Sequence, residues 1–176
     1  LHSVGKVFKT FSPNPYERVF FGGTVILCIT LLLGTTRYSG TGIEVIVSAI
    51  GGTARNTDFF WKMLFTAITL ACGYKGGEII PSFFVGATFG CVIAPVLGLS
   101  SSLGAAIGMV SVFCGVTNCP IASLLIALEL FGKVPILYFL LAIAISYMLS
   151  GYYSLYKTQI IAVSKYKNEY VDKKTH

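Results

Sequence analysis

The sequence predicts an all-α integral membrane fold made of short, tilted and repeatedly broken helices. Of its 176 residues, 55% are hydrophobic and only 11% are charged, and the mean hydropathy is +0.78. A soluble domain carries about 25% charged residues, because its surface must meet water. The fifty residues from 79 to 128 contain no Asp, Glu, Lys, Arg or His. As one helix they would extend roughly 75 Å, over twice the hydrocarbon thickness, so we expect a multi-pass protein.

The net charge of +6 does not indicate a nucleic acid partner, because the cations flank the apolar sequence. Lys6, Lys9 and Arg18 precede the first apolar run. Five more follow the last one: Lys157, Lys165, Lys167, Lys173 and Lys174. Cytoplasmic segments of membrane proteins carry an excess of Lys and Arg. We therefore expect both ends of the chain in the cytoplasm.

Gly, Pro and Ser interrupt the apolar sequence and divide it into helices. The expected helices cover residues 19–33, 44–50, 58–72, 79–92, 103–116, 121–131, 135–150 and, with a more amphipathic pattern, 152–164. Trp61 and Lys62 suit a membrane interface. Broken backbone is tolerated at membrane depth only where protein buries it or where it lines a cavity. Transporters use such breaks to direct helix ends at their substrates.

The chain begins at Leu1, not Met, without a signal-peptide pattern, and we expect a piece of a longer protein that lacks its N-terminal part. We divide it into a leader (1–15), a membrane unit (16–164) and a basic cytoplasmic tail (165–176). The five cysteines, an odd number without a CxxC, and the two terminal histidines indicate no metal site. Buried small apolar side chains are the better interpretation of the cysteines.

The run from Gly76 to Pro81, GGEIIP, has the chemistry of an anion site. Two glycines free the backbone and allow an ion to approach closely. The first N–H groups of the helix that follows lack internal partners, and the positive end of its dipole faces the same way. Such a helix start binds an anion without a cationic side chain. An ordinary helix start, with glycines for close packing, is the competing interpretation.

Three stretches resemble, in order and spacing, the CLC family of chloride channels and anion/proton antiporters. Residues 62–90, KMLFTAITLACGYKGGEIIPSFFVGATFG, resemble a threonine-rich helix, a GxFxP-type loop and a small-residue helix. Residues 108–132, GMVSVFCGVTNCPIASLLIALELFG, resemble the paired helices with a proline turn. Residues 150–159, SGYYSLYKTQ, resemble the last membrane helix, which supplies an anion-coordinating tyrosine. The resemblance covers about residues 10 to 165 and implies the C-terminal half of a CLC-type inverted-repeat transporter.

The resemblance also implies which residues hold the anion. The helix start formed by Gly77, Glu78, Ile79 and Ile80 would face the ion, with the backbone N–H groups of the two isoleucines as donors. The hydroxyl of Tyr156 would be the side-chain donor. A shift to the neighbouring Tyr152 or Tyr153 remains open, and so does the role of an interfacial anchor.

Glu78 departs from the pattern of chloride-handling members, which have an apolar residue there. The GGE sequence resembles the fluoride/proton antiporter branch of the family. A protonated carboxyl donates a hydrogen bond, an apolar environment favours that neutral form, and fluoride is a strong acceptor. Glu78 is therefore the candidate for proton coupling. A first-turn glutamate that only stabilises the helix dipole is the alternative.

The resemblance implies fluoride/proton antiport that exports fluoride across a bacterial plasma (inner) membrane. It also implies a homodimer in the lipid bilayer, with fluoride or chloride and protons as partners and no cofactor. The alternatives within the family are a chloride/proton antiporter and a voltage-gated-type chloride channel. A membrane enzyme or a structural scaffold would be a different class. An intramembrane hydrolase needs a nucleophile–base pair or a metal cluster, and the membrane segments contain no His, so we expect no enzyme.

Two other carboxylates are candidates for a function. Glu129 follows the long uncharged stretch and could be a proton relay, since intramembrane carboxylates are functional candidates. Its place just before Gly132 and Lys133, near a helix end, also suits an interfacial or structural role, and the resemblance to the CLC family favours a structural one. Glu44 suits a helix start.

Overall fold

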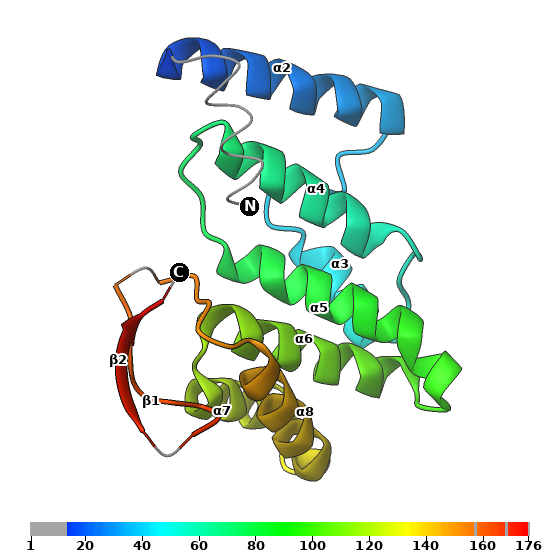
Figure 1. Cartoon of the computed structure of the whole chain (residues 1–176). Coiled ribbons are helices and arrows are strands. Elements are labelled where there is room, and N and C mark those ends of the chain that lie inside the picture. Colours follow the sequence, from blue (N-terminus) through cyan, green and yellow to red (C-terminus); the bar gives the residue numbers. More distant parts are fainter. Residues whose placement is uncertain (1–13, 157, 168, 176) are drawn as a thin grey trace.

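The computed structural model describes residues 14–156, 158–167 and 169–175, which form a set of packed helices followed by a two-stranded hairpin (Figure 1). The elements are α2 (Pro15–Leu33), α3 (Ile43–Ile50), α4 (Asp58–Ala71), α5 (Ile79–Ile93), the 3₁₀ helix η1 (Ala94–Leu97), α6 (Ser101–Thr117), α7 (Pro120–Phe131), α8 (Ile136–Leu149), β1 (Ile160–Val163) and β2 (Tyr170–Lys174). Every helix expected before residue 150 is present, with ends that differ by a few residues at most. Most of the expected leader, residues 1–13, lies outside the described residues.

The helix expected over residues 152–164 is wrong. Helix α8 ends at Leu149, and Gly151 takes a left-handed conformation (φ 57°) that turns the chain away. Strand β1 then pairs antiparallel with β2, with Ile160 opposite Lys174 and Val163 opposite Tyr170. The β-branched residues of β1 suit a pleated strand better than a helix. The hairpin therefore joins the end of the expected membrane unit to the expected basic tail.

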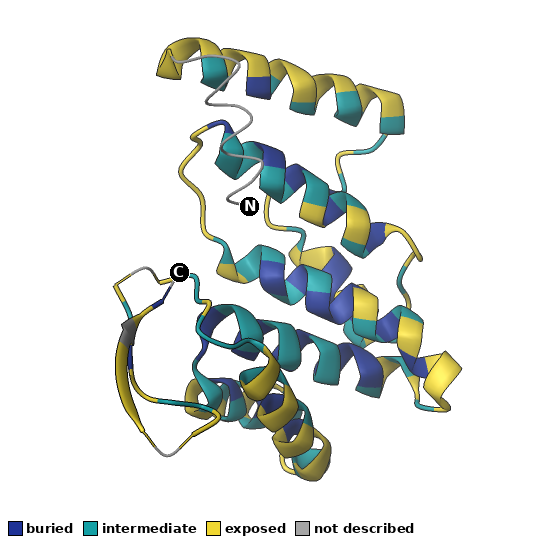
Figure 2. Ribbon diagram, in the orientation of Figure 1, coloured by how far each residue is buried: buried dark blue, intermediate teal, exposed yellow. Residues whose placement is uncertain are grey.

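Helices α2, α4, α5 and α6 lie side by side in that order (Figure 1). Helix α3 packs against α5 and α6, while α7 and α8 pack against α6 and against each other. Within the described part, α2 and the continuous run Ile79–Leu97 are long and apolar enough to cross a bilayer. Figure 2 shows α2 mostly exposed although it is apolar, as expected of a helix that meets lipid.

Four glycines allow α5 and α6 to cross closely. Gly86 and Gly90 on α5 face Gly104 and Gly108 on α6, so each helix carries a GxxxG spacing. A Cβ added to Gly86 would lie 2.5 Å from the Gly108 carbonyl oxygen and 2.8 Å from the Cα of Met109. Small residues at this spacing let two membrane helices bring their backbones into contact. The crossing therefore fixes α5 against the rest of the bundle.

A buried polar cluster ties the loop before α3 to the start of α4. The carboxylate of Asp58 is fully buried and accepts from Arg37 Nη2 (3.0 Å), Tyr38 Oη (2.8 Å) and the Arg55 backbone N–H (3.2 Å). Lys62 is only 2% exposed and donates to the carbonyl oxygens of Tyr38 (3.2 Å) and Gly40 (2.6 Å). The protein itself surrounds this cation, and the membrane-interface position expected for Lys62 stays a prediction.

The sequence predicts that the cysteines are buried apolar side chains, and the structure confirms this for three of the five. Cys72, Cys91 and Cys114 are buried, Cys119 is half-buried and Cys28 on α2 is exposed. Gly22 of α2 packs directly on Cys72, at the end of α4. The three buried cysteines thus fill contacts between helices.

Candidate anion site

The start of α5 presents two backbone donors without an internal partner. Glu78 precedes the first helical residue, and its carbonyl accepts the Ser82 N–H at 3.1 Å. Pro81 is the third helical residue and has no N–H to satisfy. The N–H groups of Ile79 and Ile80 donate to none of the residues that the structure describes. They remain available at the positive end of the helix.

The segment just before α5 is open. Gly76 and Gly77 are exposed, and a Cβ added to either would meet no atom within 4 Å. Neither glycine has a positive φ, so neither backbone strain nor packing inside the described residues requires a glycine there. The half-buried Glu78 makes no side-chain hydrogen bond to the helix start. Within the described residues, nothing therefore packs against the Cβ positions of the two glycines before the helix start.

Tyr156 lies in the segment between α8 and β1, where its backbone is held at both polar groups. Its N–H donates to Ser154 Oγ (3.2 Å), and its carbonyl accepts from the Gln159 N–H (3.0 Å) and Thr175 Oγ1 (2.6 Å). The residue is 44% exposed, and its hydroxyl makes no hydrogen bond to residues 14–155, 158–167 or 169–175. A fixed backbone thus carries a hydroxyl that is free to bind.

The competing tyrosine at position 152 is less suited to bind an ion. Its hydroxyl shares a hydrogen bond of 2.9 Å with Ser164 Oγ. The geometry therefore favours Tyr156 over Tyr152. Within the described part of the chain, no hydrogen bond joins Tyr156 to Glu78 or its neighbours.

Asn118 organises the break between α6 and α7. It ends α6 in a left-handed conformation (φ 59°), which asparagine tolerates better than most residues. Its side chain is buried, and Nδ2 donates to the carbonyl oxygens of Gly151 and Tyr153, both at 3.2 Å. The break expected from the sequence at residues 117–120 therefore also anchors the chain after α8.

Lys165 of the tail reaches back into this break. Its Nζ donates to Asn118 Oδ1 (2.5 Å), the Tyr147 carbonyl (2.7 Å) and Ser150 Oγ (3.0 Å), and lies 3.9 Å from the centre of the Tyr147 ring. Burial lowers the pKa of Lys165. From the sequence this residue is only part of a basic tail, and no local pattern marks it as different from its neighbours.

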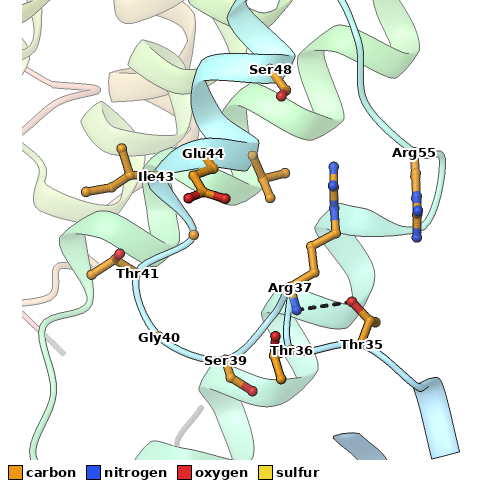
Figure 3. A pocket seen from close by; sticks show the side chains of 12 residues that line it. Thr35, Thr36, Arg37, Ser39, Gly40, Thr41, Ile43, Glu44, Ser48 and Arg55 are labelled. Atoms are coloured by element: carbon orange, nitrogen blue, oxygen red, sulfur yellow. Dashed lines mark hydrogen bonds between the residues drawn. The ribbon is translucent and has the colours of Figure 1, made fainter.

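A polar pocket of about 700 Å³ lies beside the start of α3 (Figure 3). The loop before α3 and the first turn of α3 form most of its wall, including Arg37, Glu44 and Ser48, with Arg55 at the rim. The Arg37 N–H donates to Thr35 Oγ1 at 3.2 Å. Gly42 and Val45 in the pocket wall also approach α5, since a Cβ added to Gly42 would lie 2.7 Å from the Phe84 ring and Val45 shares a core cluster with Phe84. None of the site residues predicted from the sequence lines the pocket.

Comparison with known proteins gives the family. A family model described as "Voltage gated chloride channel" matches residues 1–151. The chain belongs to the CLC family of voltage gated chloride channels. The predicted resemblance is thereby confirmed, and so is the expectation that the chain is no enzyme, because this is a family of channels and transporters.

Individual relatives of this CLC chain agree with the fold. A "Chloride/fluoride channel protein" of Pseudomonas syringae pv. tomato is 37% identical over 174 residues, which cover 94% of this chain and 38% of the relative. An uncharacterized protein of Methanocaldococcus jannaschii is 30% identical over 71 residues, 40% of this chain and 18% of that protein. The crystal structure of a CLC-type fluoride/proton antiporter matches with a TM-score of 0.83 and 32% identity, over 88% of this chain and 40% of that one. The mostly helical CLC-type fold is confirmed. The chain spans about two fifths of the length of the Pseudomonas syringae relative and of the solved antiporter.

In this CLC chain, the predicted site residues occupy two places. Gly77, Glu78, Ile79 and Ile80 are consecutive at the start of α5, whereas Tyr156 lies 76 positions after the last of them, beyond α8. Their role in binding an anion stays a prediction. Glu129 is exposed near the end of α7, two residues before Phe131.

Proposed function

We propose that this chain is part of a transporter that exports fluoride in exchange for protons across a bacterial plasma membrane, as a homodimer. The observation that carries the proposal is the start of α5, where two unpartnered N–H groups stand next to a carboxyl group. A similar solved protein, 32% identical, is named a fluoride/proton antiporter, and a curated relative is named a chloride/fluoride channel. The apolar lengths of α2 and α5 fit a membrane location.

In this proposal the anion is held by hydrogen-bond donors rather than by cations. The N–H groups of Ile79 and Ile80 donate to it from the positive end of α5, and the Tyr156 hydroxyl adds a third donor. Hydrogen bonds to a charged acceptor are roughly twice as strong as those between neutral groups. Fluoride is the halide that gains most from such donors, because it is small and its charge is concentrated.

Glu78 links the anion to the proton. An ionised carboxylate about 4 Å from an anion would repel it by about 4 kcal/mol at an effective dielectric constant near 20. A protonated Glu78 removes this repulsion and adds a donor. Binding of fluoride and binding of a proton therefore favour each other, and loss of the proton drives the anion out. For exchange, the proton and the anion must reach this site from opposite faces of the membrane and leave it toward opposite faces. One carboxyl group thereby couples both movements.

A chloride/proton antiporter or a chloride channel is the second candidate. The relative from Pseudomonas syringae is named a chloride/fluoride channel, which favours this class as a competitor. A channel lets the anion run down its own gradient only. An antiporter moves it uphill when a proton gradient supplies the free energy. Proton coupling therefore separates the two candidates.

The test uses the complete protein in liposomes with equal fluoride on both sides and an imposed pH difference. A fluoride electrode follows the external concentration while a pH dye follows the protons. We expect net fluoride movement toward the acidic side, at the expense of the pH gradient. If fluoride stays equal on both sides and moves only when a fluoride gradient is imposed, and the pH gradient is unaffected, the exchange mechanism is wrong and the channel candidate stands.

A further inference from the structure

Lys165 joins the C-terminal hairpin to the membrane helices. Its ammonium group has three hydrogen atoms and donates to three acceptors, on Asn118, Tyr147 and Ser150. Two of these residues belong to the end of α8, where a cation also interacts favourably with the helix dipole. The Tyr166 hydroxyl adds a hydrogen bond to the Met148 carbonyl. The turn after β1 is therefore fastened to the end of α8.

The same contacts continue to the segment that carries Tyr156. Before Tyr156, Leu155 donates its N–H to the Val116 carbonyl (2.9 Å), and Ser154 Oγ donates to the Thr117 carbonyl (3.2 Å). After it, the buried Thr175 at the end of β2 donates to the Tyr156 carbonyl (2.6 Å). The Tyr156 backbone is thus held from α6 on one side and from the hairpin on the other.

Asn118 connects the two sides. Its Oδ1 accepts from Lys165 while its Nδ2 donates to the Tyr153 carbonyl. Loss of the lysine ammonium would leave Oδ1 buried without a donor, and a buried polar atom without a partner is costly. The Asn118 side chain would then rotate to find another donor. This would break its hydrogen bond to the Tyr153 carbonyl and release the chain that leads to Tyr156.

We infer that Lys165 is a positioning residue that fixes the Tyr156 hydroxyl at the anion site by holding the hairpin against the break between α6 and α7. The inference rests on the proposed anion role of Tyr156. It assigns to a residue of the basic tail an effect on anion affinity, whereas a lysine of a solvated tail would have none.

The test compares Lys165→Met, Lys165→Arg and the control Lys167→Met in the complete protein reconstituted in liposomes. Lys167 is exposed, and within the described residues its hydrogen bonds involve its backbone alone: its N–H donates to Ser164 Oγ and its carbonyl accepts from the Glu169 N–H. We expect Lys165→Met to raise the KM for fluoride about tenfold, the effect of losing one charge-assisted hydrogen bond. Lys165→Arg should recover most of this change, because it keeps a cationic donor. Lys167→Met should leave the KM as in the wild type.

A double-mutant cycle with Tyr156→Phe separates positioning from mere stabilisation. In the Phe background we expect Lys165→Met to change the KM less than twofold, because the hydroxyl that it positions is gone. An equally large KM change in both backgrounds, or a lowered melting temperature with an unchanged KM, would overturn the inference. Should Lys165→Met not fold, Ser150→Ala removes a single acceptor and should raise the KM about threefold, again only when Tyr156 is present.

Failure of this inference differs from failure of the proposed function. If Tyr156→Phe itself leaves the KM for fluoride unchanged while proton-driven fluoride movement persists, the positioning role is refuted and antiport stands. If proton-driven fluoride movement is absent in the wild type, the proposed function is refuted.

Discussion

Substitution of Gly86 tests whether the close crossing of α5 and α6 holds the helix that begins at the candidate site. An added Cβ would lie 2.5 Å from the Gly108 carbonyl oxygen, whereas a carbon and an oxygen in contact are about 3.3 Å apart or more. The two helices would therefore have to separate by about 0.8 Å at this point. The nearby atoms belong to the backbone of α6, so no side chain can move aside to make room.

The magnitude follows from two opposing effects. Overpacking of this kind costs about 1–3 kcal/mol, and replacing a helical glycine by alanine recovers about 1 kcal/mol of helix propensity. We therefore expect Gly86→Ala to destabilise the protein by about 1 kcal/mol. Gly86→Val adds two methyl groups to the same contact and should cost about 3 kcal/mol.

The assay is reversible unfolding of the complete protein in detergent, followed by circular dichroism. Gly76→Ala is the matched control, because its Cβ would meet no atom within 4 Å and its φ is not positive. This control should stay within about 0.5 kcal/mol of the wild type. The packing argument is refuted if both Gly86 variants are as stable as the wild type, or if Gly76→Ala destabilises the protein by as much as Gly86→Val.

Three further outcomes follow from the structure. Asp58→Ala removes the acceptor of the Arg37 guanidinium and should lower the free energy of unfolding by about 3–5 kcal/mol, measured by the same unfolding assay. Asn118→Gly keeps the left-handed backbone but loses three hydrogen bonds of the side chain. Asn118→Ala loses the same bonds and also places a Cβ in a left-handed backbone, so it should be about 1 kcal/mol less stable than Asn118→Gly. Equal stability of the two variants would contradict this role of the backbone conformation. Glu129→Gln should leave proton-driven fluoride flux unchanged, because the residue is exposed at a helix end; a loss of coupling would make it a proton relay.

The helices were predictable because capping and turn residues next to them in the sequence mark where they begin and end. Ser100 before α6 accepts the Leu103 N–H as a cap, and Asn118 before Pro120 stops the same helix at its other end. The hairpin was not predictable in this way. Its strands depend on pairing between Ile160 and Lys174, and β1 alone is too short to distinguish a strand from an amphipathic turn.

The candidate site likewise has a part that the sequence predicts and a part that it does not. The start of α5 is a local feature, so the position of Glu78 and of the two free N–H groups follows from the sequence. The environments of Lys62 and Lys165 depend instead on acceptors up to 24 and 47 positions away along the chain. A charge in sequence carries no information about such distant partners. From the sequence, Lys62 therefore suits only a membrane interface and Lys165 only a basic tail.

The ratio of fluoride to chloride flux in Glu78→Leu is the most direct test of the central claim, that Glu78 at the start of α5 selects fluoride and couples it to protons. The complete protein in liposomes is measured with each ion in turn, beside Glu78→Gln, which keeps a donor but cannot titrate. We expect the leucine variant to lower the ratio about tenfold or more, the loss of one strong hydrogen bond to the ion. The glutamine variant should keep most of the preference and lose proton coupling. An unchanged ratio and unchanged coupling in Glu78→Leu would contradict the account.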